Sequence, residues 1–148
     1  MEAEKEIKRL IEGFFQGTYL DLEATEVSIR HSMHKIGGIF LEKVVNADRE
    51  DYRGVKISCP RGHEALFREY RKKKVTTVLS EITIKRAYYY CESCGEGFIP
   101  KDRDLDIENT SFSPGIRRMI ARVGAKESFD EGRQDLEEPA GVRVTTKT

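Results

Sequence analysis

The sequence predicts an α+β protein, with helices towards both ends of the chain and a small antiparallel sheet between them. Three observations lead to this fold class. Apolar residues recur every three or four positions within residues 1–46, as they do on one face of a helix. Residues 65–90 are rich in Val, Ile, Thr and Tyr, which are typical of strands. A Ser–Pro pair at residues 113–114 precedes a further apolar period, which indicates a helix start.

The N-terminal region, residues 1–57, predicts a helical hairpin followed by a charged linker. The first helix ends near Gly17, and its apolar stripe consists of Ile7, Leu10, Ile11, Phe14 and Phe15. The second helix begins at Asp21, and its inward face is expected to consist of Leu22, Ile29, Met33, Ile36, Phe40 and Val44. The adjacent Gly37 and Gly38 each cost about 1 kcal/mol relative to alanine in a helix interior. They therefore predict a kink or a close helix contact.

The middle region, residues 58–100, predicts a small β module. The segments "ALFREY", "VTTVLS" and "EITIKRAYYY" are interpreted as three strands of an antiparallel meander. In the third segment Ile82 and Ile84 alternate with Thr83 and Lys85, which is the period of two that a strand requires. Because 35% of the residues are charged and 38% are hydrophobic, no single large core is expected.

The C-terminal region, residues 101–148, opens with an acidic segment. Its aspartates, Asp102, Asp104 and Asp106, are spaced like the start of a calcium-binding loop. Ile107 stands where that loop needs a glycine for its sharp turn. The segment is therefore interpreted as a solvated acidic connector.

Two helices are predicted after this connector. Ser113 is suited to cap the first helix, which is expected to end near Gly124. Ser128 and Glu131 form the capping-box pattern of a second helix, and Pro139 ends it.

Two short turns of the middle region carry residues that could bind a metal ion, namely Cys59, His63, Cys91 and Cys94. Four such ligands suit the tetrahedral coordination of zinc (Zn²⁺), and three thiolates with one imidazole favour zinc over an iron centre of four thiolates. With four protein ligands the site has no open position, so a structural role is expected. The alternative is three unrelated thiols and a surface histidine. His63 is the weakest ligand, because a Cys-x3-His turn is less common than Cys-x2-Cys.

Basic residues are concentrated in the same region. Residues 58–100 contain 8 Lys and Arg against 5 Asp and Glu, although the formal charge of the whole chain is zero. A footprint suited to nucleic-acid phosphates is predicted for Arg68, Arg71, Lys72, Lys73, Lys74, Lys85 and Arg86. A solvated charged hairpin is the alternative interpretation.

Length and hydropathy exclude several classes of protein. A chain of 148 residues is too short for a large enzyme that carries its own binding domain. No apolar run approaches the roughly 20 residues that cross a bilayer, and the charged N-terminus "MEAEKEIKRL" does not resemble a signal peptide. We therefore expect a cytoplasmic protein without a membrane partner.

The order of the motifs resembles the N-terminal region of a family of bacterial insertion-sequence transposases of the DDE type. The resemblance is carried by "CPRGHEA", by "VTTVLSEITIKRAYYYCESCGEGFIPKDRDLDI" and by "FSPGIRRMIARVGAKESFDEGRQDLEEPAGVRVTTKT". It implies a zinc ribbon followed by a helix-turn-helix. It also implies that the catalytic carboxylates would lie beyond Thr148, so the chain itself is expected to be non-catalytic.

The sequence departs from the family pattern at several points. The first turn lacks the second cysteine that usually precedes the Gly–His pair, so His63 would replace that thiolate. Pro139 occupies an apolar position in the first helix of the expected helix-turn-helix, and the recognition helix would be truncated.

Three functional hypotheses follow. The first is a DNA-binding fragment of a transposase with little sequence specificity. The second is a protein-interaction module that forms homo-oligomers or binds a full-length transposase as a regulator. The third is a decayed transposase remnant.

Overall fold

The computed structural model describes residues 2–15, 21–47 and 51–125. Within these ranges the chain forms four helices and one four-stranded antiparallel sheet with strand order β1-β2-β3-β4. The predicted α+β class is therefore confirmed. The strands are β1 (Lys56–Ser58), β2 (Glu64–Thr76), β3 (Glu81–Cys91) and β4 (Glu96–Phe98). The helices are α1 (Glu2–Phe15), α2 (Leu22–Asn46), α3 (Pro100–Asp104) and α4 (Pro114–Gly124).

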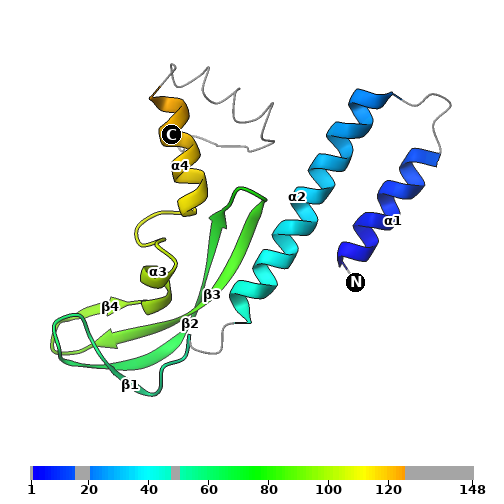
Figure 1. Cartoon of the computed structure of the whole chain (residues 1–148). Coiled ribbons are helices and arrows are strands. Elements are labelled where there is room, and N and C mark those ends of the chain that lie inside the picture. Colours follow the sequence, from blue (N-terminus) through cyan, green and yellow to red (C-terminus); the bar gives the residue numbers. More distant parts are fainter. Residues whose placement is uncertain (1, 16–20, 48–50, 126–148) are drawn as a thin grey trace.

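The long hairpin of β2 and β3 is the central element of the fold (Figure 1). The short strands β1 and β4 pair with it only at the end that carries the cysteines. At the other end, the hairpin turn lies between α2 and the start of α4 (Figure 1). The predicted three-stranded meander is therefore wrong, because "ALFREY" and "VT" belong to one continuous strand, β2. No Gly, Pro, Asn or Asp interrupts residues 66–76, so nothing in that stretch favours a turn.

The turn between β2 and β3 packs against Gly37 and Gly38 of α2. A Cβ added at Gly38 would lie 1.8 Å from Ser80 Oγ, and a Cβ at Gly37 would lie 3.2 Å from a methyl carbon of Leu79. The prediction of a close contact at this point is correct, but the partner is a β-turn instead of a helix. α2 continues through both glycines as one helix of 25 residues.

The side of α2 that faces the sheet differs from the predicted one. Leu41 and Val45 pack on the sheet, next to the glycines in the helical repeat. Five of the six residues predicted to face inward are instead exposed, with Phe40 at 69% and Leu22 at 66%, and Ile36 is half-buried. Two apolar stripes run along α2. The stripe next to Gly37 and Gly38 is the buried one, because the turn between β2 and β3 packs closely against these glycines, which have no side chains.

Side chains from α2 and the segment after it cover the free edge of β3. Glu42 accepts a hydrogen bond from the Thr83 amide at 2.7 Å. Asn46 accepts from the Lys85 amide and donates to the Thr83 carbonyl, both at 2.8 Å. Asp51 accepts from the Ala87 amide at 3.0 Å. These bonds satisfy an edge that β4 is too short to reach, and an unpaired edge would otherwise be open to another strand.

The acidic segment after Pro100 is partly buried. It forms the short helix α3, in which the Asp102 side chain is 12% exposed and accepts a hydrogen bond from Arg86 Nη1 at 2.6 Å. Ile107 is buried in the core at 2% exposure. The prediction of a solvated connector is therefore wrong for these residues, because an inward-facing guanidinium on β3 needs a carboxylate partner.

Helix α4 begins and ends as predicted. The Ser113 hydroxyl accepts a hydrogen bond from the Ile116 amide at 3.4 Å, and the helix ends at Gly124. The strand-like segment before it pairs with β2, because the Thr76 amide donates to the Ser111 carbonyl at 2.8 Å. The second predicted helix, residues 128–138, lies outside the described residues.

Two hydrophobic cores form at opposite ends of the hairpin. The helix-end core consists of Val75, Ile82, Ile84 and Ile107, with Leu41, Val45 and Leu105 against it. The cluster-end core consists of Cys59, Ala65, Ala87, Tyr89 and Cys91, with Ile57, Phe67, Cys94 and Phe98 against it. β3 supplies even-numbered residues to the first core and odd-numbered residues to the second, so the two cores lie on opposite faces of the strand.

Helix α1 lies alongside α2 and runs in the opposite direction, as the hairpin prediction requires (Figure 1). Lys35 of α2 forms an ion pair with Glu6 of α1 at 2.7 Å. Among the described residues, no helix combines the length and the apolar character that a bilayer crossing requires.

Candidate metal centre

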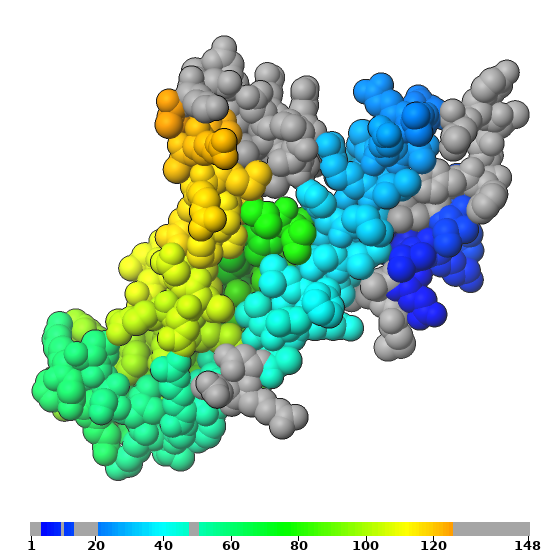
Figure 2. All heavy atoms as spheres, in the orientation of Figure 1, coloured from blue at the N-terminus to red at the C-terminus, as the bar shows by residue number. Residues whose placement is uncertain are grey.

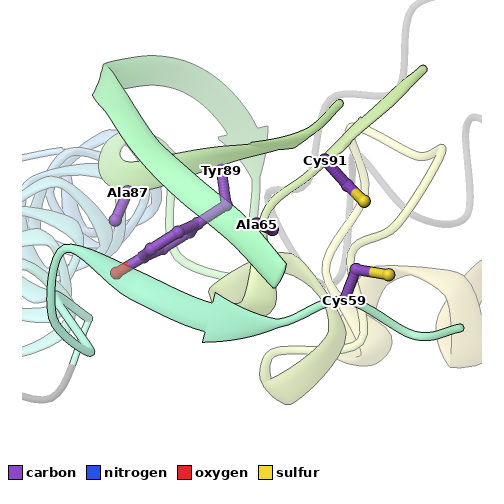
Figure 3. Packing of buried hydrophobic residues seen from close by; sticks show 5 residues of the cluster. All are labelled: Cys59, Ala65, Ala87, Tyr89 and Cys91. Carbon is purple, nitrogen blue, oxygen red and sulfur yellow. The ribbon is translucent and has the colours of Figure 1, made fainter. Parts of the chain in front are cut away.

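The four predicted ligands come together at one end of the sheet. Cys59 and His63 belong to the turn between β1 and β2. Cys91 is the last residue of β3, and Cys94 belongs to the turn between β3 and β4. Because β2 and β3 are neighbours with Leu66 opposite Tyr90, both turns emerge at the same edge. Figure 3 shows the sulfur atoms of Cys59 and Cys91 turned to the same side of the sheet.

Glycines shape both turns. Gly62 has a φ of 84° and Gly95 a φ of 67°, a region that costs other residues strain. In the first turn, the Cys59 amide donates to the His63 carbonyl at 2.7 Å and the Gly62 amide donates to the Cys59 carbonyl at 2.8 Å. The Arg61 amide also points at Cys59 Sγ, 3.4 Å away. This backbone donor would stabilise a thiolate at that position.

The distances between the ligand atoms fit a four-coordinate metal ion. All four atoms lie within 4.8 Å of one another. The Sγ atoms of Cys59 and Cys94 are 3.7 Å apart, and two sulfurs bound tetrahedrally to zinc at about 2.3 Å would be about 3.8 Å apart. His63 Nδ1 lies 3.1 Å from Cys94 Sγ. These four residues could therefore hold a metal ion.

The thiols of the cluster have unequal acidities. Burial raises the pKa of Cys94 to about 11, with further contributions from Cys91 and Cys59. Burial also acts on Cys59, but hydrogen bonds from Arg61 and His63 lower its pKa below the ordinary value. A metal ion binds the thiolate form, so binding at neutral pH would displace the proton of Cys94.

The cluster-end core packs against the two turns that carry the candidate ligands. Tyr89 is fully buried, and its ring lies 5.8 Å from that of Phe67 and 6.1 Å from that of Phe98. Its hydroxyl accepts a hydrogen bond from the Arg53 amide at 2.9 Å and donates to the Gly54 carbonyl at 3.2 Å. Figure 3 shows this ring extending away from the sulfurs, towards the chain before β1. The core is thus aromatic and small, with two of its buried members being cysteines.

The seven predicted nucleic-acid contacts do not share one surface. Arg86 is buried at 6% exposure and bonded to Asp102, and Lys73 Nζ lies 3.4 Å from the same carboxylate. The prediction that they belong to an exposed cationic face is wrong for Arg86, and the Lys73 side chain is only 18% exposed. Both side chains lie on the face of the hairpin that packs on α3. The sequence signal for this inward position was that Arg86 follows Ile82 and Ile84 at steps of two, which places all three on one face of β3.

The remaining five cations are exposed, in two groups. Arg68 and Arg71 are paired with Glu92 and Glu69, each at 2.8 Å, and they lie over the rings of Tyr90 and Tyr88. The other group is Lys72, Lys74 and Lys85, which extends from the opposite face of the hairpin. We call these three residues, together with the exposed Tyr70 beside them, the lysine face.

No protein-family model, curated protein or solved structure matches this chain. The resemblance to transposases therefore stays a prediction.

Proposed function

We propose that the chain is a zinc-stabilised, non-catalytic DNA-binding module, of the zinc-ribbon kind found in the N-terminal region of insertion-sequence transposases. Zinc is proposed because three thiolates and one imidazole at these distances match its preferred ligands. All four positions of a tetrahedral ion would be filled by Cys59, His63, Cys91 and Cys94. No position would remain for a substrate, so the metal would stabilise the fold without catalysing a reaction.

The observation that carries DNA binding is a cross-strand pair of like charges. Lys72 lies directly opposite Lys85 in the β2–β3 register, and such pairs destabilise a sheet. The Lys85 ammonium lies 4.1 Å from the centre of the Tyr70 ring. In the part of the chain that the structure describes, neither lysine forms an ion pair with a carboxylate. A phosphate backbone would supply the anion that this pair lacks.

The contrast with the neighbouring pair strengthens this argument. Arg71 lies opposite Arg86, and there Asp102 neutralises one guanidinium and Glu69 the other. The Arg71–Arg86 pair is therefore neutralised by carboxylates of the chain itself. The Lys72–Lys85 pair next to it is exposed and has no such carboxylate among the described residues. Phosphate contacts of this kind give affinity with little sequence preference.

Lys72→Gln combined with Lys85→Gln tests the proposal. Binding of the full-length chain to a fluorescent DNA duplex would be followed by anisotropy at several salt concentrations. If two phosphate contacts are lost, the slope of log affinity against log salt falls in magnitude by about 1.8. The matched control is Lys8→Gln combined with Lys56→Gln, two exposed lysines that already pair with Glu12 and Glu64.

The control variant should keep the parental slope. Absence of binding by the parent protein at low salt, or an unchanged slope in the Lys72/Lys85 variant, would rule out the lysine face as a DNA contact.

The proposed assignment to a transposase extends to α4. We place α4 directly before the family's helix-turn-helix, since its serine cap and its end at Gly124 agree with the segment that carries the resemblance. The alternative, a regulator that binds a full-length transposase, predicts capture of this chain by that enzyme in a pull-down without DNA.

A further inference from the structure

One stretch of the outer edge of β2 has no partner strand. β1 and the residue before it cover this edge as far as Phe67, whose amide donates to the Val55 carbonyl at 2.9 Å. The segment before α4 covers the edge again at Thr76, whose amide donates and whose carbonyl accepts, at 2.8 and 2.9 Å. The hairpin turn, in green in Figure 2, lies between α2 and α4. We call the stretch between the two covered ends, Tyr70 to Lys74, the open edge.

The pairing of the hairpin fixes which backbone groups face outward at the open edge. In an antiparallel pair, residues that direct both backbone groups to the partner strand alternate with residues that direct both away from it. On β3, the amides of Thr83, Lys85 and Ala87 bond to α2 and the segment after it, so they point away from β2. Their register partners on β2, which therefore point away from β3, are Lys74, Lys72 and Tyr70.

The outward backbone groups of the open edge are unpaired. Among the described residues, none of these amides or carbonyls forms a hydrogen bond on the outer side of β2. The other edge of the hairpin is satisfied at the same level by side chains of Glu42, Asn46 and Asp51. In Figure 1, α2 lies along the β3 side of the hairpin. The chain therefore closes one edge of the hairpin and leaves the other available to a further strand.

A polypeptide strand matches the open edge better than DNA does. The edge presents amides and carbonyls in one line, so a matching partner must both accept and donate hydrogen bonds. The phosphates of the DNA backbone are acceptors only, whereas an extended polypeptide supplies donors and acceptors with the same repeat. At about 3.4 Å per residue, the open edge is about 14 Å long. This length suits a short extended segment.

The side chains beside the open edge favour an acidic partner. Lys72 and Lys74 are exposed on the lysine face, and Lys85 lies next to Lys72 on β3. A partner residue directly opposite a lysine places its side chain on the same face of the sheet, and opposite charges in such pairs stabilise a sheet. Carboxylates at every second position of the partner would therefore meet Lys72 and Lys74.

A second copy of this chain is a poor partner for the open edge. In an antiparallel pair that joins all the outward residues, each Lys72 would face the same residue of the other copy, and Arg71 would face Lys73. Like charges directly opposite each other destabilise a sheet. Lysines on an edge strand protect against self-association for this reason. The same side chains attract a strand that carries carboxylates.

From these observations we infer that the open edge of β2 binds an extended acidic segment of another protein. The segment would add a strand to the sheet, with its carboxylates on the lysine face. Recognition would come from the backbone of β2 as well as from its lysines. The inference therefore goes beyond DNA binding and does not depend on it.

Binding of a short blocked peptide of alternating glutamate and valine to the full-length chain tests the inference. Amide hydrogen exchange would be followed by NMR, with and without the peptide. The peptide should add protection at the amides of Tyr70, Lys72 and Lys74, which face outward. The amides of Arg71 and Lys73 face β3 and should be protected already without the peptide.

N-methylated peptides of the same charge separate strand pairing from charge attraction. Methylation of the glutamate amides removes the donors that would face β2, and it should abolish binding. Methylation of the valine amides leaves those donors intact and should preserve binding.

A charge reversal on the protein tests the acidic preference. Lys72→Glu should raise the dissociation constant of the peptide by about tenfold, because a cross-strand attraction becomes a repulsion. The matched control is Lys8→Glu, at an exposed position of α1, which should leave the constant unchanged.

Absence of added protection at the three outward amides, or equal binding of the two methylated peptides, would overturn the proposed strand addition. Protection of these amides by a DNA duplex and not by the peptide would assign the open edge to nucleic acid instead. Protection that rises with protein concentration alone would assign it to a second copy. A chain that fails to bind DNA can still show the peptide effect, so this inference and the proposed function fail separately.

Discussion

The two ends of the β2–β3 hairpin are stabilised by different means. The helix-end core is made of aliphatic side chains that come from three separate parts of the chain, α2, the hairpin and the segment after α3. The cluster-end core is small and aromatic, and it is bounded by cysteines and by two turns that contain glycines. The first end can be stabilised by burial of apolar surface. The second end has few aliphatic residues to bury, so its stability should depend on the metal ion.

The comparison extends to the buried charges. At the helix end, Asp102 compensates Arg86 and Lys73 within the protein. At the cluster end, three thiols and an imidazole converge, and a divalent cation would compensate their thiolates. One end therefore supplies its counter-charge from its own sequence, whereas the other would take it from a bound cation.

Removal of the metal should have the largest effect, and it should be confined to one end. Structural zinc contributes on the order of 10 kcal/mol of apparent binding free energy to small modules. With a chelator, or in Cys94→Ser, hydrogen exchange should lose protection over β1, β4 and residues 88–91 of β3. Protection over residues 73–76 and 82–84, in the helix-end core, should persist.

The matched control for this experiment is Ser93→Ala, an exposed position in the same turn that is not a candidate ligand. Elemental analysis of the parent protein should find one zinc per chain. A metal-free protein whose β1 and β4 amides stay protected would contradict the comparison.

The next largest effect is expected at the internal charge cluster. Asp102→Asn leaves Arg86 and Lys73 without their carboxylate, and the loss of one partner from a buried ion pair costs about 3–5 kcal/mol. The control is Asp104→Asn, two residues along the same helix, where an exposed aspartate pairs with Arg53. This exposed pair should contribute roughly 0–1 kcal/mol. Equal free energies of unfolding for the two variants, measured in urea, would show that the helix end does not depend on Asp102.

The smallest predicted effect concerns the contact between α2 and the hairpin turn. Gly38→Ala introduces a Cβ only 1.8 Å from Ser80 Oγ and 2.9 Å from its Cβ, and such overpacking costs about 1–3 kcal/mol. Gly13→Ala, in α1, meets no atom within 4 Å and should stabilise its helix by about 1 kcal/mol. Thermal unfolding should therefore place the first variant below the parent protein and the second at or above it. A Gly38 variant as stable as the Gly13 variant would show that the turn can move away from the helix.

Local patterns in the sequence predicted α1, α2, α4 and β3, but not the full length of β2 or the short elements β1, β4 and α3. The apolar periods gave the positions of α1, α2 and α4, and Ser113 marked the start of the last of these. The candidate metal cluster was predictable because each pair of ligands lies within one short turn. A sheet is needed only to bring the two turns together, and the strand pattern of residues 81–91 already predicted a sheet.

Interactions between distant residues were not predictable in the same way. The more regular apolar stripe predicts the wrong inward side for α2, because the hairpin turn packs on Gly37 and Gly38. The sequence also predicts one footprint of basic residues, yet Arg86 is buried against Asp102. In both cases the local period was correct. The group that packs on each face, the hairpin turn on α2 and Asp102 on β3, comes from a remote part of the chain.

The sequence by itself therefore determined where α1, α2, α4 and β3 lie and which four residues could bind a metal ion. These properties follow from neighbours a few positions apart. Only the tertiary structure decided which apolar stripe of α2 is buried, which cations remain outside and how the edge of β3 is covered. Those choices depend on contacts between distant residues, such as Arg86 with Asp102, 16 residues apart, and Glu42 with Thr83, 41 residues apart. No local pattern in the sequence reports such contacts.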